Sequence, residues 1–80
     1  MKNSEIGARI RAVRLSRHIK RMELAELLGI SASTVAAYEN GDIIPPVETL
    51  SAIADIFSIS LNMLVFGIAD PGENEMIFRE

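Results

Sequence analysis

Apolar residues recur along most of this chain at the spacing of α-helices. Ile6, Ile10 and Val13 follow one another at steps of four and three residues, which puts them on one face of a helix. Similar apolar runs occur in four later segments, and no segment shows the two-residue alternation of a half-buried strand. The pattern therefore predicts an all-α fold, a compact domain of five short helices.

Glycine and serine mark the boundaries of the second and third predicted helices. Gly29 directly follows an apolar run over residues 22–28, and Gly41 follows the segment 34–40. Glycine just past such a run indicates the end of a helix. Ser31 is a good N-cap for the third helix. The two helices are therefore expected to be joined by a tight turn at residues 29–31.

Proline and serine open the last two predicted helices. Pro45-Pro46 precede the apolar face of a fourth helix, whose first turn tolerates proline. Ser60 caps a short fifth helix, which Gly67 closes. After residue 67 the chain becomes polar and acidic, with a turn signal at residues 70–72. We therefore expect one domain over residues 1–67 and a C-terminal tail over residues 68–80.

The composition excludes several classes of protein. Eighty residues are enough for a single domain. The chain has no cysteine and one histidine, which excludes disulfides, thiolate metal sites and multi-histidine metal sites. It has no glycine-rich phosphate loop and no apolar segment long enough to span a bilayer. We expect a cytoplasmic binding module rather than an enzyme, with no cofactor, metal or membrane partner.

Charge is distributed unequally between the two halves of the chain. Residues 1–40 carry seven basic and four acidic residues, whereas residues 41–80 carry one basic and seven acidic residues. The net charge of −3 thus divides into +3 and −6. This asymmetry suggests a basic contact face for an anionic partner. The alternative is a solvated first helix, whose arginines are expected to point away from its apolar stripe: Arg9, Arg11, Arg14 and Arg17.

Many residues occur in the order and spacing of a known family. The chain resembles the lambda-repressor/Cro-type (XRE-like) helix-turn-helix family over about residues 6–67. The matching residues are Ile6-Gly7, Arg9-Ile10-Arg11, Glu23-Leu24-Ala25-Glu26-Leu27-Leu28-Gly29-Ile30-Ser31, Thr34-Val35, Tyr38-Glu39-Asn40-Gly41, Pro45, Glu48-Thr49-Leu50 and Ile53-Ala54. The resemblance implies a five-helix domain that binds operator DNA as a two-fold dimer. It also implies that the second and third helices form the DNA-reading unit, with the third in the major groove.

Several matching residues also have a structural interpretation. Ala25 is small, which lets the second and third helices approach closely where they cross. Gly29 can take the left-handed conformation that reverses the chain, and Val35 would fill the gap between the two helices. Glu39 is expected to pair with an arginine of the first helix, and Arg14 is the predicted partner.

The start of the second helix departs from the family. Members commonly have Ser-Gln there, whereas this chain has Lys20-Arg21. Lysine is a poor N-cap, and a cation opposes the helix dipole at that end. The pair makes more sense beside a phosphate, which helix N-termini and cations both attract; the alternative is a solvated charge pair. Arg17 lies in the preceding loop and could join them, and His18 is expected to be an exposed loop residue where the family commonly has glycine.

The third helix departs from the family as well. Its outward positions are expected at Ala32, Ala36 and Ala37, where polar or basic side chains are usual. Alanine offers only methyl contact with thymine, which leaves the short hydroxyls of Ser33 and Thr34. The candidate DNA contacts are Arg17, Lys20, Arg21, Ala32, Ser33, Thr34, Ala36, Ala37, Tyr38 and Asn40.

Two questions about this helix stay open at the level of sequence. Tyr38 is interpreted first as a core or rim aromatic residue and second as a phosphate contact. DNA binding would be led by phosphate contacts, with specificity from DNA shape and dimer spacing. The alternative is that the alanine face, or the tail, binds a protein partner, as in an adaptor or antitoxin-like protein.

The end of the chain carries the candidate dimer contacts. In the family, the fifth helix and the residues after it often form the homodimer interface. The residues assigned to this role are Leu61, Val65, Phe66, Ile68 and Phe78. The alternative for the tail is a frayed acidic end. A dimer would bind an inverted-repeat operator in double-stranded DNA, in a bacterial or phage-encoded system, and would be nucleoid-associated when bound.

Overall fold

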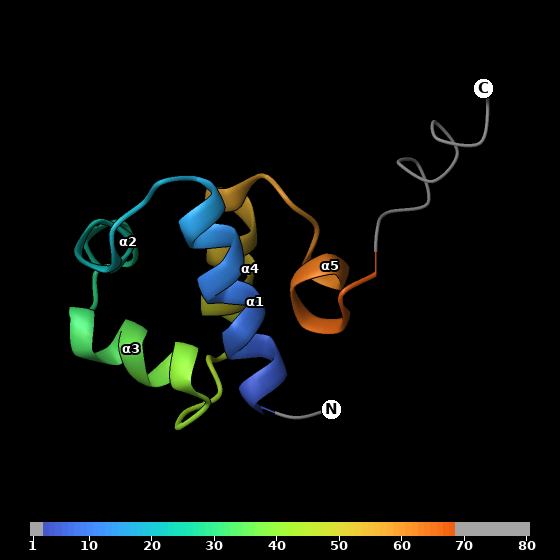
Figure 1. Cartoon of the computed structure of the whole chain (residues 1–80), viewed down its shortest axis with the longest axis horizontal. Helices are drawn as coiled ribbons and strands as arrows, with labels where there is room; N and C mark the ends of the chain where they lie inside the picture. The colour runs from blue at the N-terminus through green and yellow to red at the C-terminus, as the bar shows by residue number, and fades with distance from the viewer. Residues whose placement is uncertain (1–2, 69–80) are drawn as a thin grey trace.

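Five α-helices form the part of the chain that the structure describes. The structure is a computed structural model; it describes residues 3–68, with side chains from Glu5 onward. The helices are α1 Asn3–Ser16, α2 Arg21–Leu28, α3 Ala32–Asn40, α4 Val47–Phe57 and α5 Leu61–Phe66 (Figure 1). No strand occurs within residues 3–68, and the predicted all-α fold of five helices is confirmed. None of the described helices is long and apolar enough to span a membrane.

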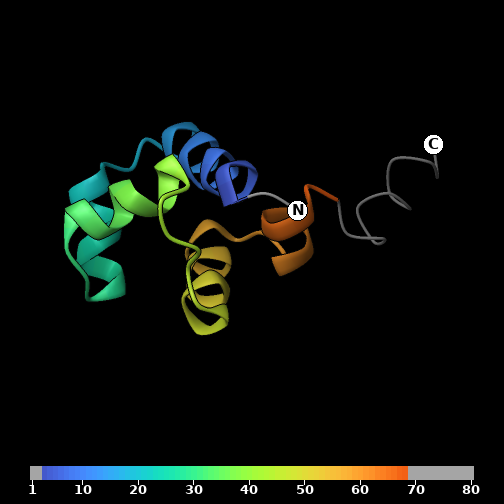
Figure 2. The same ribbon diagram turned by 90° about the horizontal axis from the view of Figure 1, so that it is seen from below.

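Helix α1 is the central element of the fold. It contacts α3, α4 and α5, whereas α2 packs against α3 and α4. The pair α2–α3 therefore lies at one end of the described structure and α5 at the other (Figures 1 and 2). Each helix contributes to a single core, whose most fully buried side chains are Ile10, Leu24, Val35, Ile53, Phe57 and Leu64.

The helix boundaries follow the signals in the sequence at most positions. Gly29, Gly41 and Gly67 all have left-handed backbones and end α2, α3 and α5. The hydroxyl oxygens of Ser31 and Ser60 accept hydrogen bonds from Thr34 N and Met63 N, at 3.1 and 2.9 Å. Both serines are therefore N-caps, as predicted.

The sequence predicts the two prolines in the first turn of α4. The structure places both just before the helix instead. Pro46 is the N-cap, with an extended backbone (ψ 159°), and α4 begins at Val47. Pro45 is buried beneath this start. A residue that precedes proline is disfavoured in the helical region, which opposes an earlier start of the helix at Pro45.

The arginines of α1 do not all point away from the core, which corrects the expectation from the sequence. Arg9 donates from Nε to Leu64 O at 2.8 Å and from Nη2 to Val65 O. Arg17 donates from Nη2 to Phe57 O at 2.8 Å. These carbonyls belong to the last turns of α5 and α4, where no backbone donor is left for them. Arg9 of α1 and Arg17, which directly follows α1, thus close the ends of two other helices.

His18 has an unusual backbone conformation in the turn between α1 and α2. Its φ is 58°, in the left-handed region, which costs a residue with a Cβ about 1–2 kcal/mol. We expect His18→Gly to raise the free energy of unfolding by about 0.5–1 kcal/mol, after the greater chain entropy of glycine in the unfolded state is allowed for. Urea unfolding would measure the gain, and His18→Ala, which keeps the Cβ, is the control without one. A loss of stability with glycine would contradict the assigned conformation.

Candidate nucleic-acid interface

Helices α2 and α3 and the turn between them form the unit that the sequence predicted. The turn over residues 29–31 is closed by hydrogen bonds from Gly29 N to Glu26 O and from Ile30 N to Ala25 O, at 3.2 and 3.0 Å. Ala25 and Val35 are buried where the helices pack together. The small side chain of Ala25 allows this close packing, and the outer side of α3 is left as a free surface.

The outer surface of α3 carries little hydrogen-bonding capacity. Ser33 and Asn40 are exposed, and Ala36 and Ala37 between them are half-buried. Two methyl groups therefore separate a hydroxyl near the beginning of the helix from a carboxamide at its end. The alanines in the sequence of this helix predict such a small number of donors and acceptors.

Two of the candidate DNA contacts face inward. Ala32 is half-buried and packs against the core, which corrects its expected outward position. It precedes the buried Val35 by three residues, and positions three apart lie close together around a helix. Tyr38 is 7% exposed and belongs to the core, as its first interpretation expects. A phosphate contact through its hydroxyl stays a prediction.

The hydroxyl groups at the start of α3 are bonded to one another. Ser31 Oγ lies 2.9 Å from Thr34 Oγ1 and 3.0 Å from Ser33 Oγ. The N-cap thus holds both hydroxyls that were expected to read bases. Ser33 is the exposed one, whereas Thr34 is half-buried, so Ser33 is the more accessible of the two.

The start of α2 is a favourable environment for an anion. Lys20 is exposed and occupies the N-cap position with an extended backbone. Its ammonium group is only a donor, so it cannot accept from the N–H groups of the first turn. Glu23 Oε1 accepts a hydrogen bond from the backbone N–H of Lys20 at 2.7 Å. This bond satisfies the N–H of the cap residue but none of the N–H groups in the first turn of α2. The positive end of α2 and the exposed lysine attract an anion here, whereas the Glu23 carboxylate in the same turn opposes one.

Arg21 forms part of a buried ion network with Glu39 and Arg14. Arg14 Nε lies 2.6 Å from Glu39 Oε2, and Arg21 Nε lies 3.1 Å from Glu39 Oε1. The Glu39 side chain has no exposed area, whereas the Arg21 side chain is 40% exposed. The predicted pair of Glu39 with Arg14 is confirmed. The Arg21 side chain stays partly exposed, although its Nε is bonded to Glu39.

Several of the described cations of the first half are bonded within the fold, whereas Arg11 is an exposed cation of α1. Arg9 and Arg14 are engaged inside the fold, and Arg17, though exposed, is bonded to a carbonyl of α4. Lys20 and Arg21 remain as the cations at the start of α2. The charge asymmetry of the sequence is therefore largely a sign of internal arginine bonds.

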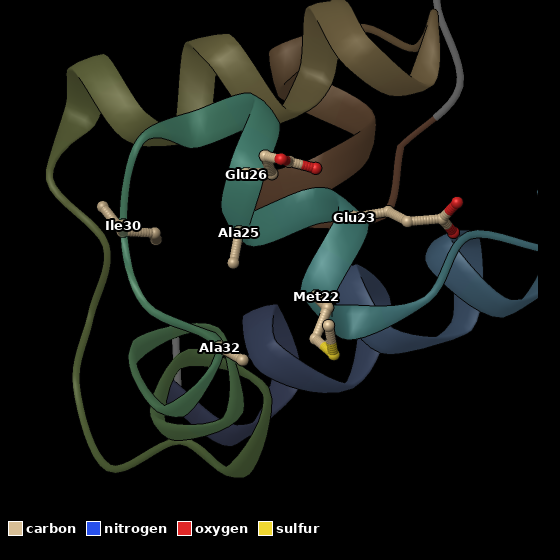
Figure 3. A pocket seen from close by; sticks show the side chains of 6 residues that line it. All are labelled: Met22, Glu23, Ala25, Glu26, Ile30 and Ala32. Atoms are coloured by element: carbon tan, nitrogen blue, oxygen red, sulfur yellow. The ribbon is translucent and has the colours of Figure 1, made fainter.

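A hollow between α2 and α3 was not predicted from the sequence. It measures about 360 Å³ and is lined by Met22, Glu23, Ala25, Glu26, Ile30 and Ala32 (Figure 3). Glu23 and Glu26 are exposed along its edge, and their carboxylates would repel a phosphate. The spacing of residues 22–32 does not indicate this hollow, because Met22 fits the apolar run of α2 and is nevertheless exposed at the hollow.

The candidate dimer residues lie on and next to α5. Leu61, Phe66 and Ile68 are exposed, and Val65 is half-buried against the core. Phe78 lies outside the described residues. Three apolar side chains at one end of the molecule thus remain open to solvent.

Comparison with known proteins identifies the family that shares this architecture. The sequence profile of a helix-turn-helix family matches residues 10–64. The ImmF control region 10 kDa protein of Bacillus phage phi105 is 38% identical over 60 residues, which are 75% of this chain and 67% of that protein. The immunity repressor of the same phage is 32% identical over 75 residues, 94% of this chain but 48% of the repressor. The chain thus spans about half of the repressor's length.

A solved structure shares the fold of the described residues. The P22 c2 repressor, solved in complex with a synthetic operator, superposes with a TM-score of 0.74 and 28% sequence identity. The match covers 79% of this chain and 96% of the repressor chain. The likeness therefore extends over nearly all of that domain.

Proposed function

The chain belongs to the helix-turn-helix family, and from this membership we propose that it is a transcriptional repressor that binds operator DNA. The observation that carries the proposal is the likeness of its fold to the P22 c2 repressor, which was solved on an operator. The same unit, α2 and α3 joined by a tight turn, is available here with a free outer surface on α3.

In the proposed complex, α3 of each subunit of a homodimer enters the major groove. Leu61, Val65, Phe66 and Ile68 on and beside α5 supply the dimer contact. The two copies of α3 then lie one duplex turn apart, about 34 Å. Two-fold symmetry of the protein requires an inverted repeat in the DNA.

Phosphate contacts supply most of the proposed binding energy. Lys20 and the start of α2 receive one phosphate group, because the ammonium charge and the helix dipole attract it together. Arg21 adds the exposed part of its guanidinium, and Arg17 lies in the preceding turn. Such contacts set the register on the duplex but carry no sequence information.

Direct reading of bases is correspondingly sparse. Ser33 and Asn40 supply the polar contacts of α3, and asparagine can pair with adenine. Ala36 and Ala37 offer methyl contact with thymine. Specificity then depends also on the sequence-dependent shape of the operator and on half-site spacing.

A second candidate function is a protein-binding scaffold of the adaptor or antitoxin type. The alanines of α3 favour it, because a surface of methyl groups packs well against another helix. The acidic hollow between α2 and α3 would likewise suit a protein partner better than DNA.

Selection of bound sequences from a random DNA pool at low salt separates these functions. Enrichment of an inverted repeat is the expected result for a dimeric repressor. Weak, uniform retention would mean that phosphate contacts act alone. No retention would contradict DNA binding and favour the protein-binding scaffold.

Lys20→Ala tests the phosphate contact at the start of α2. Each such contact contributes about −0.9 to the slope of log K against log salt, so a dimer of the variant should have a slope shallower by about two. Affinity should fall alike for all sequences. Salt titrations by fluorescence anisotropy would measure both quantities.

The control for Lys20→Ala is Arg11→Ala, which removes the same charge from an exposed position on α1. An equal effect of the two variants would mean that net charge alone is responsible. Lys20 is a better probe than Arg21, because Arg21 also bonds to Glu39.

A further inference from the structure

An apolar groove lies between α5 and the beginning of α4. It measures about 470 Å³. Val47 and Leu50 of α4 line one side, and Leu61, Val65 and Phe66 of α5 line the other. Ile6 and residues 44–46 complete it.

The groove has the chemistry of a binding site for an apolar segment. Asn62 is the only polar side chain among its lining residues. Val47 is 66% exposed and Phe66 56% exposed, so the walls are open rather than closed on each other. Exposed apolar walls of this kind usually mark a site that another segment or molecule covers.

We propose that residues 76–78 of the same chain dock in this groove. Met76, Ile77 and Phe78 form an apolar run in the tail, after the polar and acidic residues 73–75. The described chain reaches Ile68, two residues beyond the groove residue Phe66. The eight steps from Ile68 to Met76 span up to about 26–29 Å, whereas the six-residue α5 is only about 9 Å long.

The sequence between the groove and the apolar run favours a return of the chain. Asp70-Pro71-Gly72 is a turn signal, and a reversal there directs residues 76–78 back toward α5. Asn62 can hydrogen-bond to the backbone of an extended segment that lies between apolar walls.

The covalent link through residues 69–75 favours the same chain over a second copy as the occupant of the groove. A linker of this length holds the segment at a local concentration on the order of millimolar. The segment of another molecule reaches that level only in a millimolar solution. In a monomer the same chain is therefore the favoured occupant of the groove at ordinary protein concentrations.

Docking has a consequence for the homodimer, which rests on the proposed function. Leu61, Val65 and Phe66 line the groove and are also proposed dimer contacts. A docked segment covers them, so the tail competes with the partner subunit for α5. Loss of the tail should then strengthen self-association severalfold.

Paramagnetic labelling tests the docking directly. The chain has no cysteine, so Glu80→Cys provides a single site for a spin label. We expect broadening of the methyl resonances of Val47, Leu61 and Val65, and none at Leu27 of α2 at the far end of the fold (Figure 1). Absence of broadening at the groove would overturn the proposal.

Two further samples identify the occupant and the residue that anchors it. Adding Phe78→Ser to the labelled protein should abolish the broadening, whereas the control Asn74→Ser should leave it unchanged. Unchanged broadening with Phe78→Ser would overturn the assignment to the apolar run. The second sample mixes isotope-labelled protein without a spin label and spin-labelled protein without isotopes. Broadening at the groove in this mixture would show a second copy there and overturn docking within the chain.

Sedimentation equilibrium of the chain without residues 73–80 tests the consequence separately. The expected result is a dimer dissociation constant lowered severalfold relative to the full chain. An unchanged or raised constant would overturn the competition but not the docking measured by NMR. A monomer in both proteins, with broadening present, would refute the proposed homodimer and leave the docking intact.

Discussion

Replacing Glu39 by alanine is expected to lower the free energy of unfolding by about 3–5 kcal/mol, the loss that follows when one partner of a buried ion pair is removed. The Arg14 side chain is only 7% exposed and has the Glu39 carboxylate at 2.6 Å. Without that carboxylate its charge stays buried, with the carbonyl of Ile19 at 2.9 Å as its remaining partner. Total stabilities of small domains are about 5–15 kcal/mol, so the loss is a large share of the whole.

Thermal unfolding followed by circular dichroism would measure this loss. For a domain of this size each kcal/mol shifts the midpoint by about 4–8 °C, so a fall of roughly 12–40 °C is expected. Arg21→Ala is the matched control, because its side chain is 40% exposed and exposed pairs contribute about 0–1 kcal/mol. The double variant Glu39→Leu with Arg14→Met should recover much of the stability, because no buried charge is then left without a partner. A fall below about 1 kcal/mol for Glu39→Ala would show that the network carries little energy.

Replacing Gly7 by alanine is expected to cost about 3 kcal/mol, at or beyond the upper end for added methyl groups in packed sites. A Cβ at this position would lie 2.3 Å from Tyr38 O and 2.6 Å from Glu39 O. Both are backbone atoms, so no side-chain rotation can relieve the clash. Helices α1 and α3 would have to move apart.

The sign of this effect makes the experiment decisive. Helix propensity alone would make Gly7→Ala stabilising by about 1 kcal/mol, because alanine is the better helix former. Ala8→Gly, at the exposed neighbouring position of α1, measures that propensity term in the opposite direction. Urea unfolding of both variants would separate the terms. A gain in stability with Gly7→Ala would contradict the close approach of α1 to α3.

Gly7 and Glu39 act at the same junction. Gly7 lets the backbone of α3 approach α1, and Glu39 holds Arg14 of α1 and Arg21 of α2. The orientation of α3 relative to both neighbours therefore depends on these two residues. Under the proposed function, variants that stay folded at low temperature should still lose DNA affinity, because α3 would meet the groove at another angle.

The sequence by itself determined the helices and their order. Gly29, Ser31, Gly41, Ser60 and Gly67 mark boundaries that the structure confirms, because capping and left-handed termination are local properties of a few neighbouring residues. The pair of Glu39 with Arg14 was also predicted correctly. A carboxylate with a structural role needs a cation as its partner, and the first predicted helix is rich in arginine. The family resemblance, over most of the chain, supplied the arrangement.

Only the tertiary structure decided what the remaining charged and apolar side chains do. Arg9 and Arg17 appeared free in the sequence, yet they bond to carbonyls 40 or more residues away. Ala32 appeared to face outward but packs on the core, and Gly7 gave no sign that backbone atoms of α3 lie against it. The groove beside α5 combines residues from α1, α4, α5 and a loop. Spacing along one helix cannot predict such contacts, because they depend on the distances and angles between helices.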